Sequence, residues 1–236
     1  MASFRRLKSR VRDILADQQW RDRLTELEDL GPGQVKGPLF SLLLDKDEAV
    51  RWRAAAGFGW LARRMAAESM ESARELMRMF MWRMNEESGN LGWGVPEAMA
   101  SAMARNETLA REFHSILASY AQTGEGRDGN YLDHAELRRG VYWGLGRLAR
   151  AFPDMARQHA GVLRRGLRES DAVSRGYAAW ALGILRDPED LDRLQELAGE
   201  DAEIALFRDG HLEKTSVARL AREAVRAIRS TEADHA

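Results

Sequence analysis

The sequence contains no cysteine among its 236 residues. This absence excludes disulfide bonds, thiolate nucleophiles, iron–sulfur clusters and zinc sites built from cysteine. A chain without disulfides is typical of a reducing compartment, so we expect a cytoplasmic protein. The sequence also lacks an apolar run of membrane-spanning length and a secretory apolar segment. We therefore predict no membrane partner and no export by that route.

An excess of positive charge is missing as well. The 36 lysines and arginines balance 37 aspartates and glutamates, which gives a net charge of −1. Proteins that bind nucleic acid through its phosphates usually carry a basic surplus, so this balance argues against a nucleic-acid partner. Only four of the cationic residues are lysines. The dominant arginine suits bidentate pairing with carboxylates and stacking on aromatic rings.

Several motifs of catalysis and metal binding are also absent. The sequence has no Gly-x-Ser-x-Gly elbow and no P-loop, and its five histidines are scattered without metal-ligand spacing. The loop 124–133 holds Asp128, Asn130 and Asp133, but their spacing fails the pattern of an EF-hand calcium site. We predict no metal site, no cofactor and no catalytic residue, and we favour a binding protein over an enzyme.

What the sequence does contain is a repeated unit, seen in residues 43–61, 137–148, 174–185 and 217–228. The first three copies share a glycine and an arginine in register, namely Gly59, Gly146 and Gly183, and Arg51, Arg138 and Arg175. Gly183 follows Gly146 by 37 residues, and Gly146 follows Gly59 by 87, which leaves room for one further repeat between them. Periods of about 40 residues with two helices each indicate a HEAT-type solenoid.

The first copy carries a specific pattern of small, apolar and charged residues. Its members are Asp45, Asp47, Val50, Arg51, Ala54, Ala55, Gly57, Phe58, Gly59 and Leu61. This pattern is similar to the short HEAT-like repeats of phycobilisome lyases. The motifs in residues 81–89, 92–99 and 139–148 also resemble those of a group of uncharacterised bacterial HEAT-repeat proteins. The resemblance implies a helical solenoid and brings no known activity with it.

The predicted fold is an all-α solenoid of about five HEAT-like helix pairs in a single domain, residues 1–236. Residues 1–34 would form an N-terminal cap with a capping helix, followed by repeats at 35–66, 67–105, 106–151, 152–186 and 187–230. We expect first helices at 37–44, 67–84, 107–121, 153–166 and 190–198, and second helices at 48–65, 96–104, 133–151, 171–185 and 216–229. Asp209-Gly210, between two short apolar runs, predicts a small β-hairpin near residues 203–215.

Tryptophan stands at four positions of the second helices where the repeat pattern expects a polar residue: Trp52, Trp60, Trp143 and Trp180. The second helices of such solenoids line the concave face, which is the usual binding surface. Arg139, Trp143 and Arg147 are spaced by four residues and must share one face, where they could hold an anion. The sequence leaves two readings open: a partly exposed aromatic groove, or tryptophans packed beneath neighbouring helices.

Residues 81–102 depart from the repeat with a glycine-containing loop and a helix that starts at a proline. Trp93 and Glu97 are four apart and would share a face, and Glu97 falls in the first turn, where the helix dipole stabilises a negative charge. Asn85, Glu86 and Glu87 could line the same edge. The competing reading is structural, with Glu86 or Glu97 paired to a repeat arginine.

Together these features predict a non-catalytic scaffold that holds a peptide or protein partner in an aromatic and arginine-lined concave groove. The candidate binding residues are Trp52, Asn85, Glu86, Trp93, Glu97, Arg139, Trp143, Arg147 and Trp180. The alternative is a small-molecule binder or an enzyme, lyase-like or DNA-glycosylase-like, that uses Glu86, Glu87 or Glu97. That alternative rests on analogy of fold.

Overall fold

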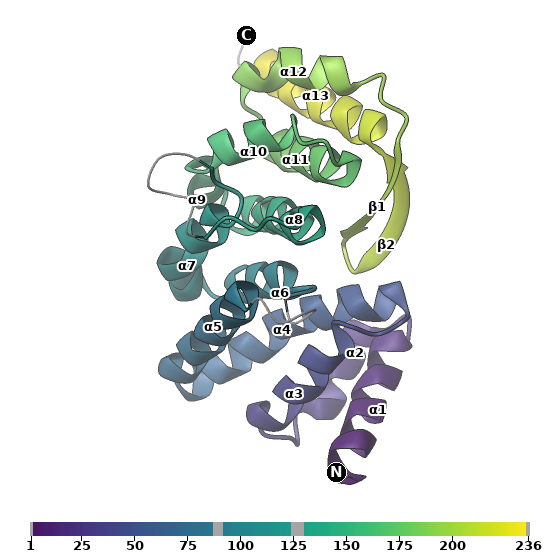
Figure 1. Ribbon diagram of the computed structural model, residues 1–236, viewed down its shortest axis with the longest axis vertical. Helices are drawn as coiled ribbons and strands as arrows, with labels where there is room; N and C mark the ends of the chain where they lie inside the picture. Colours follow the sequence, from purple (N-terminus) through teal and green to yellow (C-terminus); the bar gives the residue numbers. More distant parts are fainter. Residues whose placement is uncertain (1, 87–91, 124–129, 235–236) are drawn as a thin grey trace.

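The computed structural model describes residues 2–86, 92–123 and 130–234. Its helices form two rows. The inner row consists of α4 (Glu48–Glu68), α6 (Val95–Met103), α8 (Ala135–Ala151), α11 (Ala172–Leu185) and α13 (Val217–Asp234). The outer row consists of α3 (Pro32–Leu42), α5 (Met70–Asn85), α7 (Glu107–Ser119), α9 (Pro153–Arg157) with α10 (Ala160–Gly166), and α12 (Leu191–Leu197). Each inner helix packs on the next one along the chain, so the inner row forms a stack (Figure 1).

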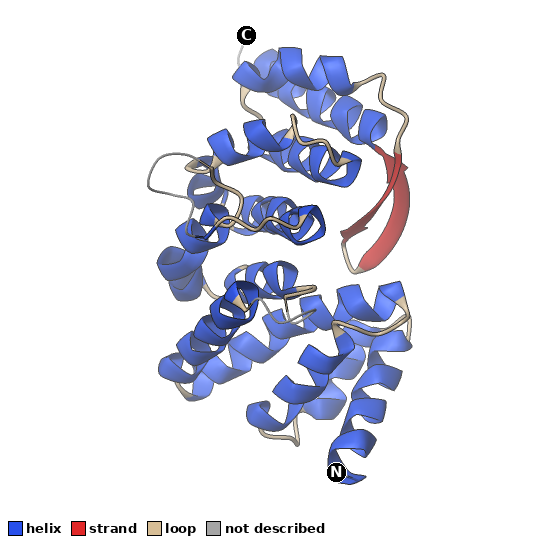
Figure 2. Cartoon of the chain, viewed as in Figure 1, coloured by secondary structure: helices blue, strands red, loops and turns tan. Residues whose placement is uncertain are grey.

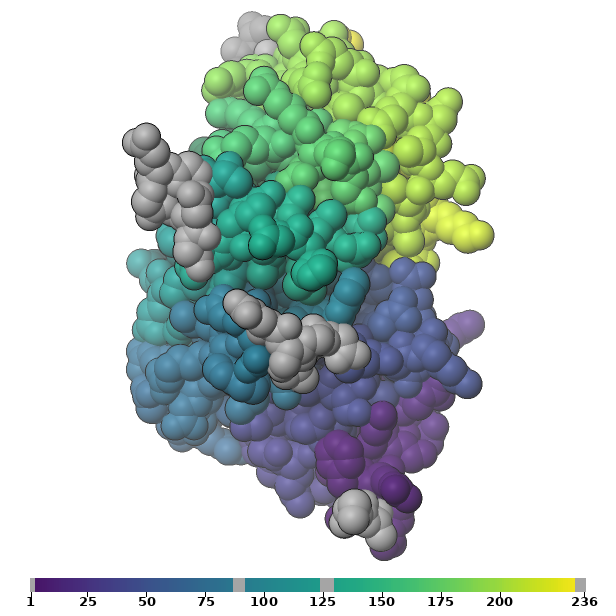
Figure 3. All heavy atoms as spheres, in the orientation of Figure 1, coloured from purple at the N-terminus to yellow at the C-terminus, as the bar shows by residue number. Residues whose placement is uncertain are grey.

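The N-terminal segment packs against the first helix pair. It comprises α1 (Ala2–Ala16), the short α2 (Trp20–Arg23) and the 3₁₀ helix η1 (Leu24–Leu27). Helix α1 contacts both α3 and α4, and Arg12 forms an ion pair with Asp45 at 2.9 Å. The space-filling view shows the sequence colours succeeding one another along the long axis (Figure 3). Such an order is expected of a solenoid, in which each repeat contacts its neighbours.

The predicted helix pairs are present, and their bounds differ from the expected ones by a few residues in most cases. The largest difference lies in the fourth outer helix, which is divided into α9 and α10 on either side of His159. Polar side chains mark several helix starts, because they accept hydrogen bonds from backbone N–H groups that lack a partner in the first turn. Asp47 caps α4, Asn106 caps α7 and Asp171 caps α11 in this way.

The repeat arginine has a structural role, and this role explains why it recurs. In each of the three copies, its Nη1 atom donates a hydrogen bond to the backbone carbonyl six residues earlier, in the turn before the inner helix. The distances are 2.9 Å from Arg51 to Asp45, 2.6 Å from Arg138 to Leu132 and 2.5 Å from Arg175 to Glu169. The arginine therefore fixes the turn of its own repeat, because it satisfies a carbonyl that no helix can satisfy.

The repeat glycine marks the point where one inner helix touches the next. A Cβ atom at Gly59 would lie 2.7 Å from the carbonyl oxygen of Ser101 on α6. A Cβ at Gly183 would lie 2.7 Å from the Cα of Ala224 on α13, and one at Gly146 would overlap the ring of Trp180. Glycine permits the close approach of the backbones at Gly59 and Gly183 and leaves room for the Trp180 ring at Gly146, so the aligned glycines set the spacing of the stack.

The predicted β-hairpin is also present, as β1 (Glu203–Arg208) and β2 (His211–Ser216). The strands are antiparallel, and Arg208 pairs with His211 across the turn. Asp209 and Gly210 have φ angles of 54° and 89°, which fit the left-handed backbone of a tight two-residue turn. The hairpin leaves the C-terminal helices and runs along the inner row toward the N-terminal ones (Figure 2).

No helix in the part of the chain that the structure describes combines the length and the apolar character needed to cross a membrane.

Candidate functional site

The hairpin lies across the middle of the concave face. Phe207 of β1 stacks on Trp52 of α4, with ring centroids 5.5 Å apart and an angle of 11° between the planes. Trp143 Nε1 on α8 donates a hydrogen bond to the Phe207 carbonyl at 2.8 Å, and Tyr177 Oη on α11 donates to the Ala205 carbonyl at 2.7 Å. Three inner helices therefore hold the first strand.

The hairpin turn reaches the N-terminal cap. Trp20 Nε1 donates to the Gly210 carbonyl at 3.2 Å, and Arg150 of α8 forms an ion pair with Asp209 at 2.8 Å. A Cβ at Gly210 would lie 2.6 Å from the guanidinium carbon of Arg21, so the turn rests directly on that side chain. The hairpin divides the concave face into two cavities, one on either side of it.

This division decides between the two readings of the tryptophans. Trp143 is 2% exposed and Trp180 is 8% exposed, so both are buried, while Trp52 is half-buried beneath the hairpin. Trp60 is half-buried as well, so two of the four tryptophans are packed beneath their neighbours and two stay partly exposed, and within the described residues the four do not form one aromatic groove. Arg139, Trp143 and Arg147 do share a face of α8, but the hairpin covers Trp143, and the two arginines line different cavities. They cannot act as one anion site, because a buried ring separates them.

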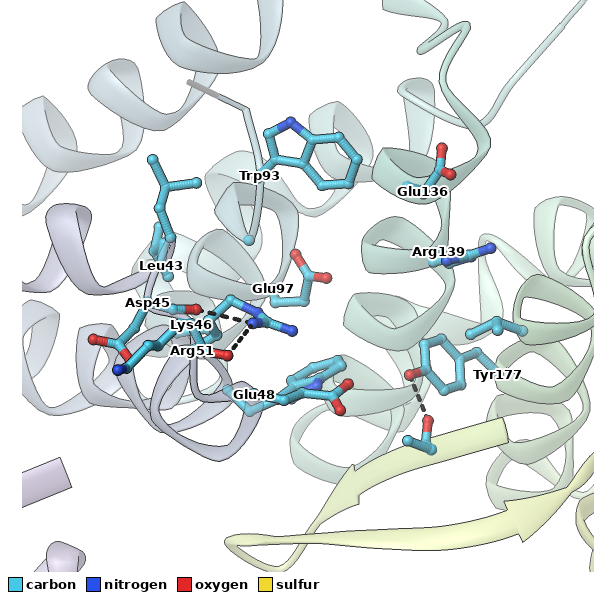
Figure 4. A pocket seen from close by; sticks show the side chains of 16 residues that line it. Leu43, Asp45, Lys46, Glu48, Arg51, Trp93, Glu97, Glu136, Arg139 and Tyr177 are labelled. Atoms are coloured by element: carbon cyan, nitrogen blue, oxygen red, sulfur yellow. Dashed lines mark hydrogen bonds between the residues drawn. The ribbon is translucent and has the colours of Figure 1, made fainter. Parts of the chain in front are cut away.

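The first cavity, called here the Glu97 cavity, has a volume of about 640 Å³. It lies where the first two turns of α4, α6, α8 and α11 meet, and Ala205 of the hairpin is one of its lining residues. Figure 4 shows these helices and the hairpin around the cavity. Four of the nine predicted residues line it together: Trp52, Trp93, Glu97 and Arg139. Sequence reasoning missed Glu48, Glu136 and Tyr177, which line it as well. Their place in the first two turns of the inner helices could have indicated them.

Glu97 is the most unusual group in this cavity. Its carboxyl group lies directly on the backbone of α8, since a Cβ at Gly140 would be 2.5 Å from Glu97 Cδ. The Oε2 atom is buried and accepts no hydrogen bond from the described residues. Burial raises the pKa of Glu97 to about 7. The sequence suggested that the helix dipole would stabilise its charge, but desolvation outweighs both that effect and the hydrogen bond from the Glu97 backbone N–H, which lowers the pKa.

The other carboxylates and the cations of the Glu97 cavity differ in their bonding. Glu48 and Glu136 form no ion pair within the described residues. Arg139 is held by Asp171 through two hydrogen bonds of 2.9 and 2.6 Å, which raise the pKa of Arg139. Arg51 donates to a backbone carbonyl, as described above. Two further charged residues line the cavity: Asp45, which is paired with Arg12, and Lys46, which forms no ion pair within the described residues. The suggested pairing of Glu97 with a repeat arginine is not seen among those residues.

Aromatic rings supply the apolar walls. Trp93 is 40% exposed at the mouth of the Glu97 cavity, and Trp52 meets Tyr177 edge-on, with ring centroids 6.4 Å apart. Figure 4 shows Glu97 between the Arg51 side and the Arg139–Tyr177 side of the cavity, with Trp93 above it. Rings beside free carboxylates form an environment that attracts organic cations.

The remaining predicted residues lie elsewhere. Trp143, Arg147 and Trp180 line the second cavity. Asn85 and Glu86 lie at the C-terminal end of α5 and line neither cavity. Glu87, named with Glu86 and Glu97 in the alternative function, lies outside the described residues.

Comparisons with known proteins bear on the fold alone. No protein-family model matches the chain, and no curated protein matches it. Among solved structures, an engineered protein is 15% identical, with 95% of this chain and 96% of that chain covered and a TM-score of 0.49. A designed armadillo repeat protein in complex with the peptide (KR)4 is 15% identical, with 94% and 99% covered and a TM-score of 0.47.

A HEAT-like repeat protein from the archaeon Thermococcus onnurineus NA1 is 13% identical, with 94% of this chain and 80% of that chain covered and a TM-score of 0.43. None of these three is a phycobilisome lyase, so that subtype stays a prediction. The stacked helix pairs, with their repeat glycine and arginine, are those of a HEAT-like repeat solenoid.

Proposed function

We propose that this chain is a non-catalytic binding scaffold whose Glu97 cavity accepts an organic cation, an ammonium or a guanidinium group. The observation that carries the proposal is the buried carboxyl group of Glu97, which has no hydrogen-bond donor for Oε2 among the described residues. A cation would supply that donor and favour the ionised carboxylate. Trp52 and Trp93 support the same ligand class, since ring faces attract cations.

The size of the Glu97 cavity favours a single cationic group as the ligand over an extended peptide. A volume of about 640 Å³ lies within the range typical of small-molecule sites. The hairpin also interrupts the concave face at Phe207, so an extended peptide has no continuous path along the inner helices. We therefore replace the predicted peptide groove by a cavity for a single cationic group. That group belongs either to a free small molecule or to a lysine or arginine side chain of a partner.

Calorimetric titration with two probes tests the proposal. Agmatine represents the free cation, and a blocked Gly-Arg-Gly peptide represents a partner side chain. We expect at least one probe to bind, and Glu97→Gln to weaken it roughly tenfold or more, because the substitution removes the charge and keeps the shape. The matched control is Glu75→Gln, which makes the same change at an exposed position outside both cavities.

The outcomes separate the sources of the cation. Binding of agmatine alone assigns the site to a small molecule, and tighter binding of the peptide assigns it to a partner side chain. The proposal fails if neither probe binds, or if Glu97→Gln binds as well as the unaltered protein does.

A further inference from the structure

The second cavity, called here the arginine cavity, lies on the other side of the hairpin and has a volume of about 550 Å³. It is bounded by the N-terminal cap, by the inner helices α4, α6, α8 and α11, and by the hairpin turn. Six arginines line it, whereas Asp209 is the only acidic residue among the described lining residues. The whole chain has a net charge of −1, so this surplus is local.

Four of these arginines are free of acidic partners. Arg21, Arg63, Arg105 and Arg147 form no ion pair with any described residue. The other two are engaged, Arg150 with Asp209 at 2.8 Å and Arg208 with Glu223 at 3.0 Å. The single acid of the cavity is therefore already paired with an arginine that lies beside the free ones.

Arg147 is the deepest of the four. It is half-buried on α8, and this burial, together with the nearby charges of Arg105, Arg150 and Arg21, lowers the pKa of Arg147 to about 10. Arg21, Arg63 and Arg105 are exposed, so the cost of desolvation falls on Arg147, and like charges close to it add to that cost unless a counter-charge joins them. Among the described residues Asp209 opposes this effect on Arg147, but it is already ion-paired with Arg150, so the group of arginines keeps a surplus of positive charge.

A second observation also points to an anion in this cavity. Ser101 of α6 lines the arginine cavity, is 2% exposed, and its Oγ atom has no hydrogen-bond partner among the described residues. Its backbone carbonyl lies against Gly59 at the closest approach of α4 and α6, so the residue is fixed in place. A buried hydroxyl without a partner is costly and uncommon in native proteins. An anion in the cavity would accept a hydrogen bond from this hydroxyl.

We propose that the arginine cavity binds a small, multiply charged anion of the phosphate-ester or diphosphate class, held by Arg147, Arg105, Arg21 and Arg63 and by the Ser101 hydroxyl. The fork of a guanidinium matches two phosphate oxygens, and a group of four calls for more charge than one carboxylate carries. This inference is independent of the cation proposed for the Glu97 cavity, which lies on the opposite side of the hairpin.

Titration calorimetry at constant ionic strength tests this inference, with inorganic pyrophosphate as the probe and citrate as a carboxylate of similar charge. We expect one pyrophosphate per chain and weaker binding of citrate. Arg147→Met and Arg105→Met should each weaken pyrophosphate binding roughly tenfold or more, and Ser101→Ala should weaken it several-fold. Arg165→Met removes an exposed charge outside both cavities and should leave the affinity unchanged.

Two further measurements distinguish anion binding by these arginines from an effect of the substitutions on the fold. Arg63 is exposed, so Arg63→Met should keep the fold and still weaken binding several-fold. Arg147→Met should raise or preserve the melting temperature of the ligand-free protein, because it removes an unpaired cation. The proposal is overturned if pyrophosphate does not bind, if Arg63→Met and Arg147→Met both keep full affinity, or if citrate binds as tightly as pyrophosphate.

Discussion

At the scale of single residues, Glu97 links the stability of the fold to pH. Its pKa of about 7 in the folded state exceeds the ordinary value of 4.5, so the folded protein binds the proton more tightly than the unfolded chain does. The stability that the neutral carboxyl group contributes is fully present below about pH 4.5 and is lost as the pH rises through 7.

A neutral substitute should therefore stabilise the protein only at high pH. We expect Glu97→Gln to raise the free energy of unfolding by about 1–3 kcal/mol at pH 8.5, and to change it little at pH 4.5. Urea denaturation at the two pH values measures the difference. The exposed Glu75→Gln serves as the reference, and an equal effect of Glu97→Gln at both pH values would contradict the assignment.

The same linkage gives the cation site a pH dependence. A cation prefers the ionised carboxylate, so its affinity should increase from about pH 5.5 to about pH 8.5 as Glu97 loses its proton. Titrations with the cationic probe across this range measure the trend. In Glu97→Gln the residual affinity should show no pH dependence with a midpoint near 7. If that midpoint persists, the pH dependence belongs to another titrating group.

Gly140 places the Glu97 carboxyl group. A Cβ at Gly140 would lie 2.5 Å from Glu97 Cδ, so in Gly140→Ala the flexible end of the Glu97 side chain must move away from α8. We expect the pKa of Glu97 to fall toward its ordinary value, because the carboxyl group becomes more exposed to water. Nuclear magnetic resonance titration of the labelled glutamate carbon reports this directly, and an unchanged pKa would show that Glu97 has no alternative position.

At the scale of elements, two glycines should respond differently to substitution, because only one of them lies where two inner helices touch. A Cβ at Gly183 would meet the backbone of α13, whereas a Cβ at Gly33 near the start of α3 would meet nothing within 4 Å. We expect Gly183→Ala to destabilise the protein by about 1–3 kcal/mol through overpacking. Gly33→Ala should stabilise it by about 0.4–1 kcal/mol, because alanine restricts the unfolded chain. Denaturation midpoints compare the two variants. Equal effects would mean that the helix propensity of alanine alone determines the change in stability at both positions.

The hairpin depends on Phe207, which is 4% exposed and lies against Trp52 and Trp143. Phe207→Ala should cost about 3–5 kcal/mol of unfolding free energy, since it removes a buried ring between packed rings. Its cross-strand neighbour Leu212 is only half-buried, so Leu212→Ala should cost clearly less. Guanidinium denaturation measures both, and comparable losses would contradict the packing described here.

The elements could largely be read from the sequence, because helix periodicity, the repeat glycine and the Asp209-Gly210 turn are local signals. The position of the hairpin could not. It depends on contacts such as that between Trp20 and Gly210, which are 190 residues apart. The burial of Glu97 depends on Gly140 in another repeat, and the role of the repeat arginine depends on a carbonyl that sequence patterns do not identify.

The candidate site was predicted only in part for the same reason. Trp52, Trp93, Glu97 and Arg139 do meet in one cavity, because repeats place equivalent turns at the same end of the stack. The hairpin then separates Arg147 and Trp180 from them, an effect that no pattern within a single repeat can reveal.

At the scale of the whole molecule, the hairpin connects the last repeat to the N-terminal cap. In an ordinary solenoid each repeat is stabilised by its neighbours alone. Here Trp20 near the N-terminus is bonded to the turn at Gly210, so the two ends should unfold together. We expect Phe207→Ala to speed hydrogen exchange in α1 and α2 as well as in the hairpin. Exchange detected by mass spectrometry tests this, and acceleration confined to the hairpin would contradict it.

The hairpin also changes how the molecule would respond to force. A free stack of helix pairs extends gradually when its ends are pulled apart, because neighbouring repeats can tilt one after another. Here the bonds from Trp20, Trp143 and Tyr177 to the hairpin backbone span the stack from the N-terminal cap to α11. Tension applied at the ends would load these bonds first, so the molecule should remain stiff up to a rupture force and become compliant only after the hairpin detaches.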